Sequence, residues 1–538
     1  MDHIDTLLAS NTLFGGRPTT RSSKGIVAAA HPLAANAGAQ ILRQGGNAFD
    51  AVVATAAVLN VVEPFMSGLA GAGVATFFQV NQSKFGCIDF IPTVPQNFET
   101  VNTDKKRLET GPIASLGPGC LAGWHAIQQR LGKLQFSDLL QPAIQLAQDG
   151  FPVSAFFAAV TRESSKRILD NEWKRVFHSD HYWRPGELLK LPDLSNTLSA
   201  IAEKGIRHLY GGELGLKMVS HLQAYGGIIS INDLDSISPL WENTLSAEYR
   251  GHVIHVPPPP SESFQMLLSL RILEAFDLGS FKKLGVKHLD TVLRAIRIAA
   301  GVRIKNNQKS INEIHKLLND VDLLIAKVKD GNPVKGLTEQ WDSFELFHDT
   351  ALREHTTSIS VGDEEGNLVC LTQSIGSLFG SGTIIPSTGV LMNNFLFWGD
   401  QNPSSPNQII PGKRLAMCLA PTITSINGNG FLALGTPGSY GILQTQVQVM
   451  VYLLDFDLEL QDAINMPRAR LFDGAEVHIE KRIDDTTLKK LVSLGHKIKL
   501  LPEFSWRTGG MHAVSRDPKI RTFSGAADNR RDGNAIPV

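Results

Sequence analysis

The stretch HTTSISVGDEEGNLVCLTQSIG (residues 355–376) decides the fold of this chain. Its first part is rich in β-branched and hydroxyl-bearing residues, which favours a strand. The segment GDEEGN (362–367) has the composition of a turn. Leu368 to Ile375 then predict a second strand, so the whole stretch is interpreted as a β-hairpin.

The register of this hairpin determines which hydroxyl groups meet across the strands. A turn centred between residues 364 and 365 pairs Thr356 with Gln373, and a slip of one residue brings Thr372 or Ser374 beside Thr356. Cross-strand pairs of Thr and Ser are ordinary in sheets, so the hairpin alone favours a structural role. Its setting favours a functional one, because a polar segment precedes it and two glycine-rich stretches follow it, GSLFGSG (376–382) and GTPGSYG (435–441).

The length and composition exclude several classes of protein. A chain of 538 residues suits three or four domain-sized units, or one large α/β body. Its 51 basic and 52 acidic residues give a net charge of −1, which leaves no basic excess for a nucleic-acid backbone or an anionic membrane. With 7% aromatic residues, stacking platforms for single-stranded nucleic acid are also disfavoured. We therefore expect no nucleic-acid partner.

The cysteines and the N-terminal residues bear on location and on metals. None of the four cysteines lies in a CxxC pair, so we interpret them as small core residues in a reducing compartment. The N-terminus lacks the apolar centre of a signal peptide, and no run of 18 apolar residues occurs, so we expect a soluble, cytoplasmic protein without a membrane span. The segment HSDH (178–181) fits no standard metal-ligand spacing and indicates a solvated loop, so no metal is expected.

Residues 25–64 predict helices layered on a sheet. Residues 26–28 suit a strand, and a run of helix formers after them ends at a glycine pair. Asn47 is placed to cap a second helix, with Asp50 in the reciprocal capping position three residues later. That helix, residues 51–62, is apolar nearly all round and should be buried.

Further along, the pattern predicts more helices, the end of a strand, and a linker. Segment 111–153 carries two amphipathic helices, and four consecutive prolines (257–260) end a strand. The stretch SGLAGAG (67–73) resembles a phosphate loop but lacks the GK[ST] that such loops carry, so no nucleotide cofactor is expected. Residues 312–344 are polar and charged, and we interpret them as a surface linker.

Taken in order, these motifs resemble the γ-glutamyltranspeptidase family of N-terminal-nucleophile hydrolases. The resemblance runs from about Gly25 to Gly533, nearly the whole chain. The stretches that carry it are GIVAAAHPLAANAGAQILRQGGNAFDA (25–51), GPGCLAGW (117–124), LLQPAIQLAQDGFPV (139–153), YRG and PPPP (within 249–260), TTSISVGDEEGN (356–367), FGSGTIIPSTGVLMNN (379–394), KRLAMCLAPTI (413–423) and GTPGSYG (435–441).

This resemblance implies both a processing step and a fold. The family is made as one precursor that cuts itself before the first Thr of the TT motif, which here is the His355–Thr356 bond. The cut would leave a large segment, 1–355, and a small one, 356–538. The implied fold is α+β, the four-layer αββα sandwich of that superfamily, formed by the two segments as one intertwined unit. No cofactor or metal is implied.

The resemblance also assigns catalytic roles. Thr356, once N-terminal, supplies the nucleophilic hydroxyl, and its own α-amine, with an ordinary pKa near 7.7–8.0, serves as the base. By ungapped count from Thr356, the second hydroxyl that hydrogen-bonds the nucleophile is that of Ser374. The oxyanion is expected to be held by the backbone N–H groups of Gly438 and Ser439, where the family has a Gly-Gly pair. The alternative for this loop is a plain tight turn.

The residues that bind a glutamyl group in the family are replaced in this chain. PTVPQNFET (92–100) contains no arginine to bind an α-carboxylate, and Trp398 stands where an aspartate would bind the α-amine. Two serines that touch the carboxylate become Met417 and Cys418, and the His of the usual TTH is Ser358. Because a charge-assisted contact contributes about 1.5–3 kcal/mol, losing both charge partners of a zwitterion predicts weak γ-glutamyl binding.

An acyl pocket of another character is therefore expected. Its predicted substrate-binding residues are Asn394, Phe395, Trp398 and Cys418. Phe395, Phe397, Trp398 and Met417 suggest an apolar wall, with burial in the core as the alternative, above all for Phe397.

These observations predict an autoprocessing N-terminal-threonine amidohydrolase that works through an acyl-enzyme. Its small-molecule substrate would be a non-glutamyl amide, such as an acylated amine or an oxamate-like amide. One alternative is a γ-glutamyltransferase or glutathione hydrolase. Another is a catalytically silent binding or scaffold protein of the same fold, which the intact TT motif disfavours. After cleavage the large and small segments would remain associated, and a dimer of such pairs is consistent with the family.

Overall fold

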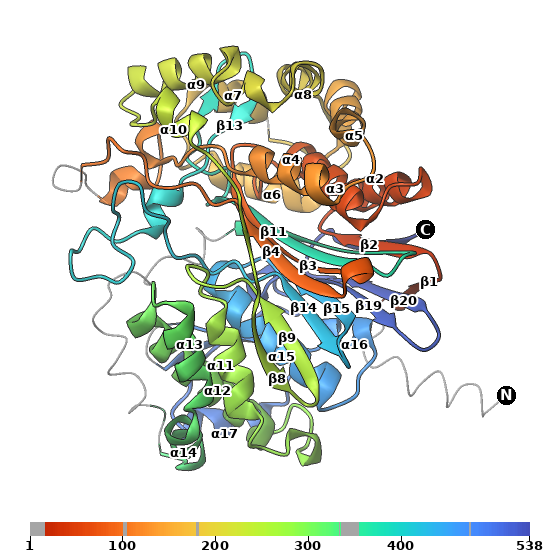
Figure 1. Ribbon diagram of the computed structural model, residues 1–538. Helices are drawn as coiled ribbons and strands as arrows, with labels where there is room; N and C mark the ends of the chain where they lie inside the picture. The colour runs from red at the N-terminus through yellow and green to blue at the C-terminus, as the bar shows by residue number, and fades with distance from the viewer. Residues whose placement is uncertain (1–16, 100–104, 179–181, 333, 335–354, 473–474) are drawn as a thin grey trace.

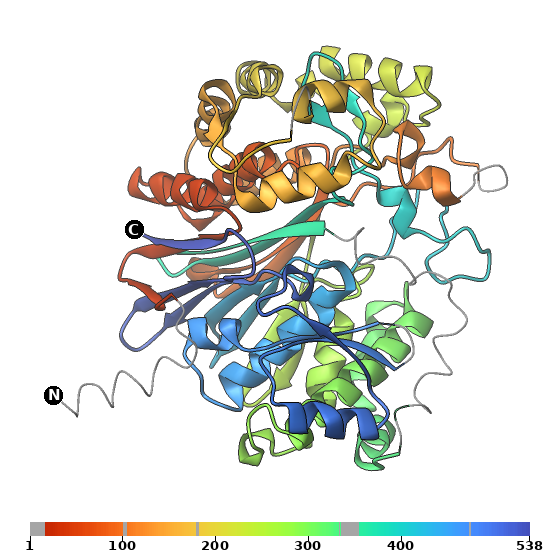
Figure 2. The ribbon, with the colours of Figure 1, turned by 180° about the vertical axis from the view of Figure 1, so that it is seen from behind.

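Two antiparallel sheets form the centre of the molecule, and helices cover both outer faces (Figures 1 and 2). The computed structural model describes residues 17–99, 105–178, 182–332, 334, 355–472 and 475–538. Helices between residues 32 and 235 lie over one sheet, and helices between residues 264 and 493 lie over the other. The layers therefore run helix, sheet, sheet, helix, which confirms the predicted αββα architecture.

The predicted hairpin lies in the middle of the first sheet, which we call the hairpin sheet. In spatial order its strands are β21 (Asn534–Pro537), β2 (Gly25–Ala29), β10 (His355–Asp363), β11 (Leu368–Gly376), β3 (Ala72–Gln79), β4 (Lys84–Asp89) and β7 (Leu240–Glu242). The second, or opposite, sheet has the order β1 (Thr20–Ser22), β20 (Thr522–Ala527), β19 (His512–Asp517), β15 (Asn429–Gly435), β14 (Thr422–Ile426), β9 (His252–Val256) and β8 (Leu245–Tyr249). Strand β9 ends directly before the four prolines, as predicted.

The helices divide between the two outer faces. Those over the hairpin sheet are α2 (Pro32–Arg43), α3 (Ala48–Val62), α4 (Cys120–Leu131), α5 (Phe136–Asp149), α6 (Ala155–Ser164), α7 (Asn171–Phe177), α8 (Pro192–Lys204), α9 (Glu213–Ala224) and α10 (Ile231–Asp235). Those over the opposite sheet are α11 (Phe264–Leu273), α12 (Val286–Asn306), α13 (Ile311–Asn319), α14 (Asp322–Lys329), α15 (Ile442–Leu454), α16 (Leu460–Asn465) and α17 (Asp485–Ser493).

Alternating side chains of the two sheets pack against each other in the central layer. Ile26, Leu368 and Cys370 of the hairpin sheet share a buried cluster with Ala433 and Phe523 of the opposite sheet. Because side chains alternate along a strand, the other face of β10 and β11 packs under α3. Both hairpin strands are therefore buried along their whole length.

Helix α3 forms as its sequence predicts and is anchored to the hairpin turn. The Asn47 side chain accepts hydrogen bonds from the backbone of Phe49 and Asp50, and the Asp50 carboxylate accepts one from the Asn47 N–H, each at 3.0 Å. All residues of α3 are buried. Asp363, in the hairpin, accepts a hydrogen bond from the Ala48 N–H at 2.8 Å. The start of α3 is thus joined to the far end of the hairpin.

Two segments predicted to be irregular contain helices. The predicted linker 312–344 was wrong where it overlaps α13 and α14. Ser310 and Glu313 form a capping box that starts α13, and the residues Ile314 and Leu318 of this helix are buried. Residues 335–344 of that prediction lie outside the described residues. Of the HSDH segment only His178, directly after α7, is described.

Each sheet mixes strands from both sides of the His355–Thr356 bond. In the hairpin sheet, β10 and β11 lie between β2 and β3, which precede that bond in the chain. In the opposite sheet, β14 pairs with the earlier strand β9, and β20 pairs with β1. The two predicted segments thus interdigitate in both sheets.

Across the described residues, no helix has the length and apolar character that a bilayer crossing requires.

Candidate active site

The predicted nucleophile lies at the start of β10. Strand β10 pairs with β11 through His355–Gly376 and Thr357–Gln373, and the register shifts between His355 and Thr357. This shift places Thr356 opposite a β-bulge in β11, a feature that commonly re-aims a side chain next to an active site. The extra residue is on β11, so Ser374 and Ile375 together lie opposite Thr356, and Gln373 pairs with Thr357 instead. Ser374 is one of the two neighbours that a slip of one residue predicted.

Ser374 contacts the bond that the sequence predicts to be cut. Its hydroxyl donates a hydrogen bond to the carbonyl oxygen of His355 at 2.5 Å and accepts one from the Gly376 N–H at 2.9 Å. A donor on a carbonyl oxygen stabilises the charge that develops there during nucleophilic attack. The sequence predicted that Ser374 would bond the Thr356 hydroxyl, whereas in the intact chain its proton is directed to the neighbouring carbonyl group.

The residue before the bond is held firmly. His355 is fully buried, and its ring stacks on Trp506 with a centroid distance of 5.4 Å and an interplanar angle of 29°. Trp506 in turn contacts the edge of Phe156, with 5.8 Å between the ring centroids. The His355 side chain is therefore held by the stacked ring, and its carbonyl group by Ser374.

Two charged residues that the sequence did not single out hold the next groups along β10. The Thr357 hydroxyl donates to Glu63 Oε2 at 3.2 Å, and Arg531 Nη1 donates to the Thr356 carbonyl oxygen at 3.3 Å. Burial raises the pKa of Glu63 to about 7, while Arg531 opposes this shift. Burial lowers the pKa of the Arg531 guanidinium to about 10, against the pull of Glu63. These two buried groups beside the Thr-Thr motif therefore shift each other's pKa in favour of the charged forms.

The predicted oxyanion loop has an unusual backbone. Gly438 has φ of 122° and Ser439 has φ of 53°, so both residues lie at positive φ. Glycine adopts such angles easily, whereas a serine there is strained. Neither backbone N–H donates a hydrogen bond to a backbone acceptor in the described part of the chain. Two adjacent N–H groups of this kind can accommodate an anion, and their role toward an oxyanion stays a prediction.

The predicted apolar wall gathers into one cluster. Phe395 and Met417 are nearly fully buried in it, and Phe397 and Trp398 pack against it while partly exposed. Core burial thus holds for Phe395, and the exposed edge of this wall comes from Phe397 and Trp398. Cys418 belongs to the same cluster, with its sulfur 4.0 Å from the Ser439 hydroxyl. Of the predicted acyl-pocket residues, Cys418 thus lies next to the predicted oxyanion loop.

Asn394 has a different environment from the other predicted pocket residues. Its side-chain amide donates to the Glu109 carbonyl oxygen and to the Ser377 hydroxyl, each at 2.9 Å, and accepts from the Ser377 N–H at 2.8 Å. These bonds use its polar atoms within the protein. Any contribution of Asn394 to substrate binding would come through the loops that it fixes.

An aromatic residue and a buried ion pair, neither predicted, complete this region. The Tyr440 ring lies 5.8 Å from that of Trp398, and the guanidinium of Arg303 lies 4.2 Å from the centroid of the Tyr440 ring. Arg303 is paired with Glu262, and both side chains are almost completely buried. The cation next to the Tyr440 ring, Arg303, is therefore already neutralised by Glu262.

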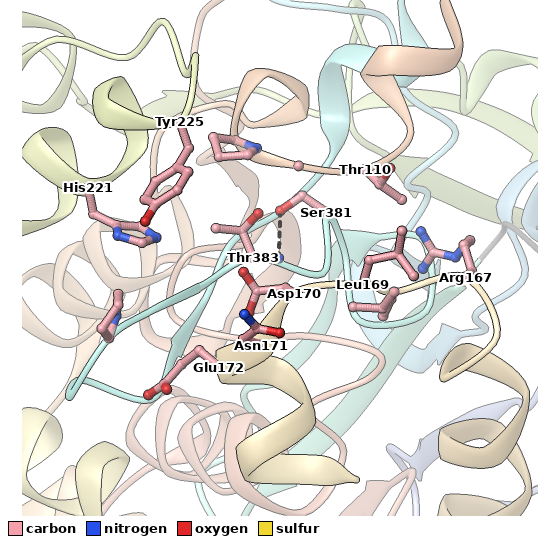
Figure 3. A pocket seen from close by; sticks show the side chains of 14 residues that line it. Thr110, Arg167, Leu169, Asp170, Asn171, Glu172, His221, Tyr225, Ser381 and Thr383 are labelled. Carbon is pink, nitrogen blue, oxygen red and sulfur yellow. Dashed lines mark hydrogen bonds between the residues drawn. The ribbon is translucent and has the colours of Figure 1, made fainter. Parts of the chain in front are cut away.

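A cleft of about 520 Å³ opens beside Thr110 and Gly111, the two residues that follow Glu109 in the chain (Figure 3). Its polar lining includes Thr110, Arg167, Asp170, Asn171, Glu172, His221, Tyr225, Ser381 and Thr383. The Gly111 N–H donates to the Ser381 carbonyl oxygen at 2.9 Å, which fixes one wall. No motif marks this cleft, because its lining comes from separate segments of the chain. Among the described residues, no three His, Cys, Asp or Glu side chains form a group suited to a metal ion.

Comparison with known proteins places this geometry among characterised relatives. The sequence model of the family described as gamma-glutamyltranspeptidase matches residues 34–538. The chain is 31% identical to the acylase ACY 1 proenzyme of Pseudomonas sp. (strain SE83), over 96% of this chain and 94% of that one. It is 28% identical to the glutathione hydrolase proenzyme of Bacillus subtilis (strain 168), over 96% and 91% of the two chains. The crystal structure of cephalosporin acylase from Bacillus halodurans superimposes with a TM-score of 0.86 at 26% identity, covering 98% of each chain.

Proposed function

The chain belongs to the gamma-glutamyltranspeptidase family, and on that premise we propose that it is an autoprocessing amidohydrolase with Thr356 as its N-terminal nucleophile. Relatives named as acylase and glutathione hydrolase proenzymes support an enzyme that acts on amide bonds after cleavage of a precursor. The observation that carries the proposal is the hydrogen bond from the Ser374 hydroxyl to the carbonyl group of His355, at a β-bulge opposite Thr356.

Self-cleavage would begin with addition of Thr356 Oγ to the carbonyl carbon of His355. Ser374 is placed to stabilise the charge on the carbonyl oxygen. The C–N bond then breaks, and the hydroxyl proton passes to the Thr356 nitrogen, which leaves an ester between the two residues. Water hydrolyses this ester, giving a carboxylate on His355 and a free α-amine on Thr356.

Turnover would reuse the same hydroxyl. The neutral α-amine of Thr356 accepts its proton while Oγ adds to the amide carbonyl of the substrate, and the Gly438 and Ser439 N–H groups stabilise the oxyanion. The amine leaving group takes the proton and departs, and an acyl ester remains on Thr356. Water, or an acceptor amine, then releases the acyl group and restores the hydroxyl.

We further propose that the acyl group is not γ-glutamyl. The chain lacks the family's charge partners for a zwitterion, and Trp398, Phe397 and Tyr440 present an aromatic edge instead. The similarity to acylases supports an acylated amine as substrate. A γ-glutamyltransferase is the second candidate, because the glutathione hydrolase of B. subtilis covers nearly the same length of chain. The four buried, unpaired thiols support our placing of the enzyme in the cytoplasm.

The test is direct. The purified protein should run on a denaturing gel as two bands near 39 and 20 kDa, about in proportion to chain length out of 58.6 kDa. End-group sequencing of the small band should begin Thr-Thr-Ser-Ile-Ser, and Thr356→Ala should stay uncut. Processed enzyme would then be offered N-acyl p-nitroanilides beside γ-glutamyl-p-nitroanilide. A single band from the wild-type chain would overturn the proposal, and faster turnover of the γ-glutamyl compound would favour the second candidate.

A further inference from the structure

Three side chains from distant parts of the chain each hold one group of the motif at the start of β10. Ser374 binds the carbonyl oxygen of His355, Arg531 binds that of Thr356, and Glu63 accepts the hydroxyl of Thr357. The proposed mechanism uses Ser374 but leaves Glu63 and Arg531 without a role. Glu63 ends α3, and Arg531 lies in the segment between β20 and β21.

One carboxylate oxygen of Glu63 is buried without a hydrogen-bond partner in the described part of the chain. This oxygen is Oε1, and the Glu63 side chain is 1% exposed. An unpaired carboxylate oxygen in such a place is costly, since burial removes water without replacing its hydrogen bonds. The charged groups that face Glu63 are Arg531 and Asp532, both from the C-terminal segment, and its polar neighbour on β10 is Thr357. His31, which caps the start of α2, faces Asp532.

Cleavage would create a new charged group on Thr356, the residue before the threonine that is bound to Glu63. The intact chain has a neutral amide at the Thr356 nitrogen, whereas the cut chain has an α-amine that ionises near neutral pH. This amine would arise in a nearly dry site, with Thr356 3% exposed and the Arg531 cation on its carbonyl group. The end of β10 would also lose its covalent tether at a bulge, where the regular strand pairing is interrupted. A nearby anion would stabilise the new ammonium group, and a hydrogen bond to the strand would replace part of the lost tether.

We propose that Glu63 is a positioning residue of the processed enzyme, which holds the strand end through Thr357 and serves as counter-charge to the Thr356 α-amine. This inference rests on the proposed function, because it requires the cut. Glu63 and the amine then titrate as a coupled pair. The ionised carboxylate favours the protonated amine, so Glu63 sets the pH above which the amine is free to act as the base. The raised pKa of Glu63 supports such coupling near neutral pH.

The test measures the amine itself, so it needs no substrate. Wild-type protein, Glu63→Gln and Glu63→Asp are treated with trace acetic anhydride from pH 5 to pH 10, and mass spectrometry of the peptide that begins with Thr356 gives the pKa of its α-amine. The pKa should fall by about one unit in Glu63→Gln, because an opposite charge at short range shifts a pKa by one unit or more. Glu63→Asp should show a smaller fall. Asp455→Asn is the matched control, since Asp455 is also a buried carboxylate with a raised pKa and an arginine partner, Arg250, but lies at the end of α15.

The outcomes separate the two proposals. An uncut wild-type chain overturns the proposed function and this inference with it. A cut wild-type chain whose amine keeps the same pKa in Glu63→Gln overturns the inference alone. If Glu63→Gln fails to fold or to cut, Glu63→Asp decides: an amine pKa between the wild-type value and one unit below it supports the counter-charge role, and an unchanged value overturns it.

Discussion

Ser374 Oγ donates its hydrogen bond to the carbonyl oxygen of His355, across the hairpin from the threonine that follows that carbonyl group. The donor, the carbonyl group and the adjacent hydroxyl residue thus meet at one bulge. Because a strand pair fixes these positions, the geometry of the proposed self-cleavage depends on the register of β10 against β11. A shift by one residue would turn Ser374 to the other face of the sheet.

Removing this donor should slow processing. We expect Ser374→Ala to fold, because the site is small and the change removes one oxygen, and to cut its His355–Thr356 bond about 100-fold more slowly than the wild-type chain. Appearance of the small fragment on a denaturing gel after synthesis measures the rate. Ser374→Thr, which keeps a hydroxyl, is the matched control and should stay within about tenfold of wild type. Cleavage of Ser374→Ala at the wild-type rate would contradict the role assigned to this hydroxyl.

Adding a carboxylate at Trp398 should improve binding of a glutamyl group. Trp398→Asp places an anion where the resemblance to the family predicts the α-amine site. The value of kcat/KM for γ-glutamyl-p-nitroanilide should therefore rise about tenfold or more, as expected for one charge-assisted contact. Trp398→Asn is of the same size without the charge and should show no such gain. Equal effects of the two substitutions would mean that the aromatic ring merely blocks the site.

The strained loop offers a test of backbone donation. Ser439→Gly should raise the free energy of unfolding by about 1 kcal/mol, because glycine adopts the positive φ of this position without strain. The variant should keep its activity, since the N–H group is unchanged. Gly438→Ala, at φ of 122°, should lose stability instead. Thermal unfolding and turnover of the two variants are compared, and loss of activity in Ser439→Gly would indicate that the Ser439 side chain matters.

Stability should fall steeply in mild acid. Burial lowers the pKa of His31, His255 and His288 to about 4 and that of His512 to about 3, from an ordinary 6.5. Below pH 6.5 the unfolded chain therefore binds protons that the folded chain does not, so stability is lost as the pH falls from 6.5 toward 4. Each pKa unit corresponds to about 1.4 kcal/mol.

Glu63 acts in the opposite direction over part of this range. Its raised folded-state pKa, about 7 against 4.5, removes stability as the pH rises from 4.5 to 7. Burial also raises the pKa of Asp89 to about 6, so this carboxylate acts in the same direction as Glu63. Four histidines with lowered pKa values outweigh these two carboxylates, so the net slope between pH 6.5 and 4.5 should be positive. Calorimetric Tm values across this range measure it, and His288→Gln, which lacks one of the titrating groups, should show a shallower slope. A Tm that stays constant down to pH 4.5 would refute the expectation.

Local signals in the sequence accounted for much of the fold. Asn47 and Asp50 predicted the start of α3, and the turn composition of residues 362–367 between two strand-like runs predicted the hairpin to within one residue of register. Ser310 and Glu313, which cap α13, carry the same kind of signal, but the charged composition of the residues that follow favours a linker. A capping box outweighs composition when apolar residues recur at helical spacing after it.

Contacts between distant residues account for what the sequence could not predict. Glu63 meets Thr357 across 294 positions of the chain, and Arg531 meets the Thr356 carbonyl group across 175. Neither lies in a motif whose spacing indicates a partner. The direction of the Ser374 hydrogen bond also required the structure, since the register alone places its hydroxyl near both the Thr356 side chain and the carbonyl group before it.

Strand β9 pairs with β14, β1 pairs with β20, and β2 and β3 flank the hairpin. Cleavage of the chain would therefore release neither product from the other. Each product would contain only some of the strands of each sheet, and the missing strands would have to come from the other product. Dilution should therefore never separate them short of denaturation, and a version encoded as two genes would have to assemble while folding, because neither half makes a finished surface for the other to dock on.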